Sequence, residues 1–180
     1  MVSWNFNTPK KLMPRLGSFL VCEKIIIDQQ QKPSVISVFQ ALSALVPEGE
    51  TIPKDTVSFT PWSILCEWFF VDDETKNKVE QVVEVLHPDG SPSPIKARVQ
   101  FEHFSKDEQG TRSYVNLFGV PIAQPGFLTV NVWIEVDSQR VTNVFPYRIK
   151  IEHTKQPPVP NDGGTLTPVF APGPSPTKPS

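Results

Sequence analysis

Apolar and polar residues alternate one by one along several stretches of this sequence. Between Ile95 and Phe101 every second residue is apolar, and the residues between them are Lys96, Arg98 and Gln100. Successive side chains of a β-strand point to opposite faces of its sheet, so this alternation is typical of a strand with one buried face. The stretches 128–136 and 141–151 alternate in the same way, and the 3-4 spacing of an amphipathic helix is nowhere sustained. The sequence therefore predicts an all-β fold.

The segments between these runs carry turn signals. His87-Pro88-Asp89-Gly90 places proline at the second and glycine at the fourth position, as a type I β-turn prefers. The run from Trp62 to Val71 is apolar on both faces except at Glu67, which predicts a central strand covered on both sides. Pro146 cannot donate a ladder hydrogen bond, so its strand is expected to lie at an edge or to contain a bulge. About eight evenly spaced strands predict an antiparallel two-sheet β-sandwich.

The composition divides the chain into three parts. Residues 1–14 show no period and predict an irregular arm that carries Trp4 and Phe6. Residues 15–154 form the predicted sandwich domain. Residues 155–180 are rich in proline and poor in large apolar side chains, so we expect a disordered tail with polyproline II character. Its short Pro-x-x-Pro pieces are compatible with docking, although a plain flexible tail is the simpler interpretation.

Charge and hydropathy exclude several classes of function. The 180 residues carry a formal net charge of −2 with scattered basic residues, which argues against nucleic-acid binding. No run of about 18 apolar residues exists, so no membrane span is expected. The apolar run before Cys22 is too short for a signal sequence, which predicts a cytoplasmic protein. Cys22 and Cys66 are then expected to remain buried, inert thiols.

Several of these strand and turn motifs resemble a known family. The opening strand ends in Cys22-Glu23, an hPDG turn follows at His87–Gly90, and a late Pro-Gly-aromatic turn lies at Pro125-Gly126-Phe127. Together they are similar to a family of small, mostly bacterial proteins of unknown function. The similarity spans residues 16–151. It implies a sandwich related in shape to C2 or immunoglobulin-like domains, and it implies no activity.

No catalytic motif is present. Gly-x-Ser-x-Gly, His-Glu-x-x-His and the phosphate-binding glycine loop are all missing from the sequence. Cys22 and Glu23 project from opposite strand faces, and no histidine lies near enough in sequence to activate the thiol. His87, His103 and His153 lack metal-ligand spacing. We therefore predict a protein that is not an enzyme and needs no cofactor.

Acidic loops leave one alternative open, because C2-like sandwiches bind calcium through loop carboxylates. The candidate ligands are Asp72, Asp73, Glu74 and Asp89, with Asp107 and Glu108 as further oxygen donors. Lys76 and Lys78 follow the first group directly, so a solvated hairpin tip is the simpler interpretation.

Aromatic residues with the parity of polar neighbours suggest a binding surface. Phe127 and Trp133 share the polar parity of their strand, and Phe104 has it on another. The N-terminal arm or the loop from Pro47 to Pro61 would cover them if they do not bind a partner. The leading hypothesis is a non-catalytic interaction or scaffold module that binds a protein partner or a second copy through this sheet face or through an edge strand at Phe145–Ile151. The alternative is a ligand- or calcium-binding C2-like sandwich.

Overall fold

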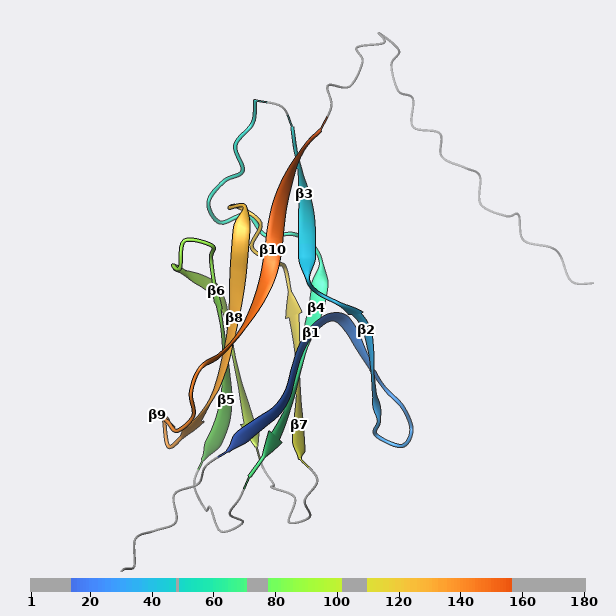
Figure 1. The fold of residues 1–180 in the computed structure, drawn as a ribbon, viewed down its shortest axis with the longest axis vertical. Coiled ribbons are helices and arrows are strands. Elements are labelled where there is room, and N and C mark those ends of the chain that lie inside the picture. The colour runs from blue at the N-terminus through green and yellow to red at the C-terminus, as the bar shows by residue number, and fades with distance from the viewer. Residues whose placement is uncertain (1–13, 48, 71–77, 102–109, 157–180) are drawn as a thin grey trace, which may run out of the picture.

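The computed structural model describes residues 14–47, 49–70, 78–101 and 110–156. These residues form ten strands and no helix (Figure 1). Their order is β1(Arg15–Ile27), β2(Pro33–Val38), β3(Ala41–Pro47), β4(Pro61–Phe69), β5(Val79–Leu86), β6(Pro92–Phe101), β7(Thr111–Phe118), β8(Gly126–Val136), β9(Gln139–Arg140) and β10(Phe145–Gln156). The prediction of an all-β fold is confirmed, and the strands number ten where the pattern predicted about eight.

The strands belong to two sheets. The smaller sheet has the order β2-β1-β4-β7, and the larger has the order β3-β10-β8-β5-β6, with β9 paired to β8. β4 lies between β1 and β7, as its two apolar faces predicted. All described pairings are antiparallel except one, because β3 runs parallel to β10 from Ala41↔Lys150 to Pro47↔Gln156. The prediction of a purely antiparallel arrangement is wrong at this pair.

The parallel pair arises where the chain changes sheet. Phe39 donates its backbone N–H to the carbonyl of Val21 in the smaller sheet, at 2.8 Å. The carbonyl of the next residue, Gln40, accepts from the N–H of Lys150 in the larger sheet, at 2.9 Å. Two adjacent residues are thus bonded to different sheets, and Phe39 is buried at the corner between them. β3 can then join the larger sheet only at its free edge, beside β10.

Pro146 occupies the position that its chemistry requires. β10 pairs with β8 from Phe145 onward, and with β3 only from Lys150 onward. Pro146 therefore lies where β10 has a single neighbouring strand, as the missing N–H predicted. Lys150 and Ile151 are already paired with β3, so the edge predicted at Phe145–Ile151 is free only in its first part.

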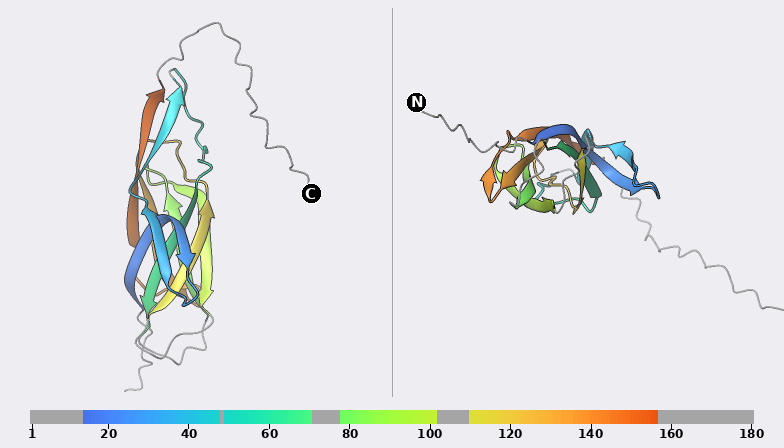
Figure 2. Two further views of the ribbon diagram at one scale, coloured as in Figure 1. Left: turned by 90° about the vertical axis from the view of Figure 1, so that its right-hand side faces the viewer. Right: turned by 90° about the horizontal axis from the view of Figure 1, so that it is seen from below.

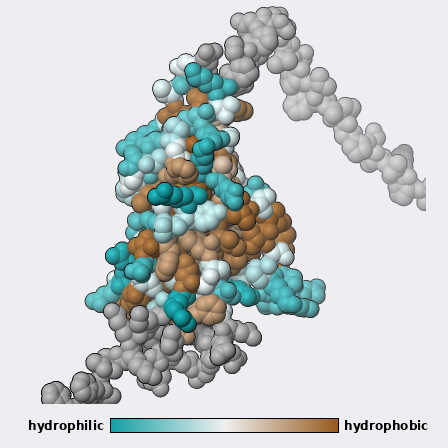
Figure 3. All heavy atoms as spheres, in the orientation of Figure 1, coloured by the Kyte–Doolittle hydropathy of each residue, from teal (hydrophilic) through white to brown (hydrophobic). Residues whose placement is uncertain are grey.

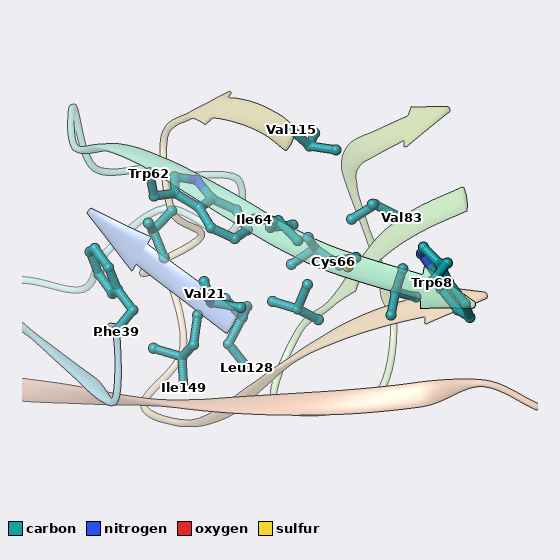
Figure 4. Packing of buried hydrophobic residues seen from close by; sticks show 14 of the residues in the cluster. Val21, Phe39, Trp62, Ile64, Cys66, Trp68, Val83, Val115, Leu128 and Ile149 are labelled. Carbon is teal, nitrogen blue, oxygen red and sulfur yellow. The ribbon is translucent and has the colours of Figure 1, made fainter. Parts of the chain in front are cut away.

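The two sheets face each other across one hydrophobic core. Trp62, Ile64, Cys66 and Trp68 alternate along β4 and point into it (Figure 4). The larger sheet contributes the opposing side chains, among them Val83, Leu128 and Ile149. Every second residue of β4 thus faces the core, as expected for successive side chains that point to opposite faces of a strand.

One polar group crosses this core. Gln81 lies on β5, fully buried, and its Oε1 accepts hydrogen bonds from Trp68 Nε1 and from Ser113 Oγ, each at 2.6 Å. Trp68 and Ser113 belong to the smaller sheet, so the amide links the two layers. Gln81 Nε2 has no hydrogen-bond partner. Burial raises the pKa of the adjacent Cys66 thiol to about 12, although a hydrogen bond with Ser113 acts in the other direction.

The β1–β2 hairpin extends beyond this core. Figure 2 shows it projecting sideways from the body formed by the two sheets. Its tip is an Asx-type turn in which Asp28 Oδ1 accepts the backbone N–H groups of Gln30 and Lys32, each at 2.8 Å. The hairpin thus has an ordered tip and a base that continues into the smaller sheet.

Candidate interaction surfaces

Trp133 is not the exposed side chain that its parity predicts. It lies on the outer side of β8, as expected, yet only 8% of its surface is exposed. It stands directly across from Val82 in the antiparallel register, and Val82 is completely buried although it faces outward. Trp133 Nε1 donates to Glu135 Oε1 at 2.9 Å. The indole therefore packs along its own sheet and is capped by neighbours, so we no longer propose it as an interface residue.

A charged cluster closes over this tryptophan. Arg98 Nη1 donates to Glu135 Oε2 at 2.6 Å and to Glu80 Oε2 at 3.3 Å, and Lys78 Nζ lies 2.9 Å from Glu80 Oε1. Burial alone would raise the pKa of Glu135, but the hydrogen bonds from Trp133 and Arg98 outweigh it and lower that pKa. Each carboxylate here is paired, so the cluster is a satisfied structural network.

The other two aromatic residues predicted at the interface are Phe127 and Phe104. Phe127, the second residue of β8, is 53% exposed, in agreement with its parity. Phe104 lies outside the described residues. Since Trp133 is covered, Phe127 forms no continuous patch with it, and its role in an interface stays a prediction.

The predicted calcium ligands are not brought together by the part of the chain that can be described. Asp72, Asp73 and Glu74 lie outside it, as do Asp107 and Glu108. Asp89 follows β5 at its end, whereas the chain re-enters the described part at Lys78, just before the start of that strand. Asp89 is occupied by local bonds, accepting from Ser91 N at 2.9 Å, Ser91 Oγ at 2.6 Å and Gln124 Nε2 at 3.1 Å, and these bonds lower its pKa. Among the described residues, no three His, Cys, Asp or Glu side chains gather closely enough to hold a metal ion.

The cysteines and histidines have structural surroundings. Cys22 and Cys66 are free thiols with no exposed surface, and burial raises the pKa of each. His87 is buried in the turn after β5, and His153 Nε2 lies 2.7 Å from the carbonyl oxygen of Ile122. His103 lies outside the described residues. A thiol with a raised pKa is the opposite of an activated nucleophile.

The β1–β2 hairpin presents the first exposed apolar surface. We define this hairpin surface by Ile26, Ile36 and Val38, which are exposed on one face of the hairpin, together with Ile27, which is exposed on the other face. Ile36 lies across from Lys24, Val38 across from Cys22, and Ile26 across from Ser34. In Figure 3, hydrophobic side chains gather on the right-hand side, where Figure 1 places β2, and hydrophilic ones cover the tip. Exposed large aliphatic side chains in this number mark a contact surface.

The outer edge of this hairpin has little protection against pairing with another strand. β2 ends the strand order of the smaller sheet and has β1 as its neighbour on one side. Its six residues, Pro-Ser-Val-Ile-Ser-Val, include no charged side chain. Edge strands usually carry lysine, proline, an inward charge or a strong bulge that prevents pairing with other chains. Of these devices β2 has proline at its first residue, Pro33, and no charge. β2 departs from the ladder only at its end, where Ser37 has a φ of 51°.

A second apolar surface lies at the other margin of the smaller sheet. Phe59 is 85% exposed and Phe118 is 65% exposed, and their ring centroids are 6.3 Å apart in a tilted arrangement. Phe118 ends β7 across from Pro61 of β4, which is exposed as well. We call Phe59 and Phe118 the aromatic pair.

Neither surface was predicted from the sequence. The absence of charge in residues 33–38 could have indicated the exposed hairpin surface, because a strand with apolar residues on both faces is stabilised when both faces are covered. Phe59 and Phe118 are separated by almost sixty residues, and only the β4–β7 pairing brings them together. No local pattern could have indicated that pair.

Comparison with known proteins adds no assignment. No protein-family model matches this chain, and no curated protein matches it either. The resemblance of its turn motifs to a bacterial family therefore remains a prediction. None of the described residues forms a helix with the length and hydrophobicity that crossing a bilayer requires.

Proposed function

We propose that this protein is a non-catalytic interaction module, a β-sandwich of the C2 or immunoglobulin-like type, that associates through its β1–β2 hairpin. The observation that carries the proposal is the uncharged β2 edge flanked by exposed Ile26, Ile36 and Val38. Backbone N–H and C=O groups along such an edge add a strand from another chain, and side chains on the two faces provide apolar contact.

A second copy of the chain is the partner that this edge fits best. Two β2 strands related by a two-fold axis would pair antiparallel and join two four-stranded sheets into one. Because β2 carries no charge, this pairing sets no like charges opposite each other. The hairpin is small, so we expect an interface at the low end of the specific range and a dissociation constant on the order of micromolar.

The test is the solution mass of the full chain, measured by light scattering over a concentration series. The unmodified chain should approach the dimer mass at high concentration, and Ile36→Lys should remain a monomer. Because Ile36 lies in the middle of β2, the two lysines would bring like charges close to the two-fold axis, which we expect to weaken association by at least about ten-fold.

Leu45→Lys is the matched control. Leu45 is an exposed aliphatic residue on β3, which is also an edge strand but belongs to the larger sheet. It should leave the dimer mass unchanged. A chain that stays monomeric at about 1 mM, or a dimer that Leu45→Lys disrupts and Ile36→Lys does not, would contradict the proposal, since millimolar affinity is too weak for a specific contact.

A further inference from the structure

The aromatic pair is held in place although it is exposed. Ser58 N donates to the carbonyl of Val120 at 2.9 Å, and Gly119 N donates to the carbonyl of Thr60 at 3.1 Å. Ser58 Oγ accepts from Val120 N at 3.2 Å and from Thr60 N at 3.4 Å. The residues on both sides of Phe59 are thus bonded to the segment that follows Phe118. The two rings are preorganised, so a ligand bound to them would not have to order the loop.

The chemistry of this surface suits proline. Phe59, Phe118 and Pro61 present three exposed rings, and Phe118 and Pro61 lie across from each other in the smaller sheet. Tyr114 lies four residues before Phe118 on the same face of β7. Aromatic residues spaced along a sheet are the feature with which proline-rich segments in the polyproline II conformation are bound. Such a segment is extended before binding, which keeps its ordering cost low.

The chain itself contains a proline-rich segment. Residues 157–180 include eight prolines, with Pro172, Pro174 and Pro176 in regular alternation. The described part of the chain ends at Gln156, which pairs with Pro47 at the end of β3. The segment from Pro47 to Phe59 is twelve residues long, so the aromatic pair lies within roughly 45 Å of Gln156. In the polyproline II conformation residues 157 to 176 would span about 60 Å, which is sufficient to reach the aromatic pair.

We propose that the C-terminal segment around Pro172–Pro176 docks on the aromatic pair of its own chain. Covalent linkage raises the effective concentration of such a segment to the millimolar range, so even a weak contact would be populated. Docking would shield two phenylalanines whose exposure is otherwise unexplained. It would also leave the hairpin surface free, because that surface lies across the sheet at the opposite margin. The two contacts are therefore independent.

Paramagnetic relaxation in the full chain tests this contact. A nitroxide attached at Ser175→Cys reports on nearby amides, and the native Cys22 and Cys66 do not compete because both are completely buried. We expect the amide signals of Ser58 to Thr60 and of Phe118 to lose about half of their intensity or more, as a contact populated at millimolar effective concentration predicts. Phe59→Ala with Phe118→Ala should restore them.

Three comparisons make the result decisive. Phe127→Ala removes an exposed phenylalanine from the other sheet and should leave the effect intact. Replacing Pro172, Pro174 and Pro176 with alanine in the same spin-labelled chain should reduce it. An even, weak effect over the whole surface would overturn the proposal. So would a local effect that appears only when spin-labelled and isotope-labelled chains are mixed, because the occupant would then be the segment of a second copy.

Discussion

Burial decides the properties of single residues in this protein more than their chemical type does. Trp133 has the parity of a solvent-facing residue, yet it is covered because Glu135 accepts its indole N–H and Arg98 bridges two carboxylates over the outer face of the sheet. A cysteine side chain can act as a nucleophile, but burial in the core raises the pKa of Cys66 and keeps its thiol protonated. In both cases the neighbours across the sheet, rather than the neighbours in sequence, set the outcome.

The raised pKa of Cys66 predicts a specific loss of stability at high pH. An unfolded thiol has a pKa of about 8.5, whereas burial raises that of Cys66 to about 12. The stabilisation that follows is complete below the unfolded value and declines as pH rises toward the folded one, by up to about 1.4 kcal/mol per pH unit. Urea unfolding of the native chain between pH 8 and pH 11 should show this extra decline.

Cys66→Ala isolates that contribution. The variant has a lower free energy of unfolding because it leaves a small cavity, but its pH dependence over the same range should be flatter than that of the native chain. Parallel curves for the two proteins would contradict the assignment. Reactivity with a thiol reagent at pH 8 gives an independent measure, since neither thiol should react before the chain unfolds.

At the scale of the elements, β4 and β5 are joined by more than apolar contact. Gln81 of β5 accepts hydrogen bonds from Trp68 of β4 and Ser113 of β7, and these bonds fix the registration of one sheet over the other. A buried amide is costly unless it is bonded, and its Nε2 is unpaired. An apolar residue in place of Gln81 would therefore remove the two hydrogen bonds that its side-chain oxygen accepts.

Gln81→Leu should destabilise the protein by about 1–3 kcal/mol, because Trp68 Nε1 and Ser113 Oγ would lose their common acceptor inside the core. The measurement is the free energy of unfolding in urea. Gln100→Leu is the matched control, since Gln100 lies on the exposed face of β6 and its replacement should change stability by less than about 0.5 kcal/mol. Equal effects of the two substitutions would show that the bridge contributes nothing.

At the scale of the whole molecule, the hairpin and the body differ in how they are stabilised. The body has side chains from two sheets packed between its layers, whereas hairpin residues such as Ile26 and Ile36 remain exposed on a strand pair that projects from it (Figure 2). A surface of this composition gains stability when a partner covers it. Self-association and thermal stability should therefore be coupled.

This coupling predicts a thermal midpoint that depends on protein concentration. A dimer that dissociates on unfolding is stabilised by mass action, by about 1.4 kcal/mol for each ten-fold rise in concentration above the dissociation constant. The midpoint of the native chain, followed by tryptophan fluorescence, should rise over a hundred-fold concentration range. Ile36→Lys should have a constant midpoint, and a constant midpoint for the native chain would argue against a dimer.

Much of the fold follows from the sequence, for identifiable reasons. The alternation in residues 95–101 and 128–136 predicted strands β6 and β8, and the two apolar faces of residues 62–71 predicted the central position of β4. Pro146 predicted the single-partner start of β10. The site was predicted less well. Phe127 is exposed as expected, but Trp133 is covered, and the hairpin surface and the aromatic pair were not anticipated.

The difference between the two outcomes has one physical cause. The alternation of apolar and polar residues and the residue preferences of turns both depend on neighbours in sequence. The sequence by itself therefore determined which residues form strands and which face of each strand is apolar. Strand order is set by contacts between distant residues. Only the tertiary structure decided that β3 joins β10 in parallel, that Arg98 and Glu135 meet above Trp133, and that Phe59 lies beside Phe118. Exposure of a side chain depends on those distant neighbours, and a surface for binding is defined by exposure.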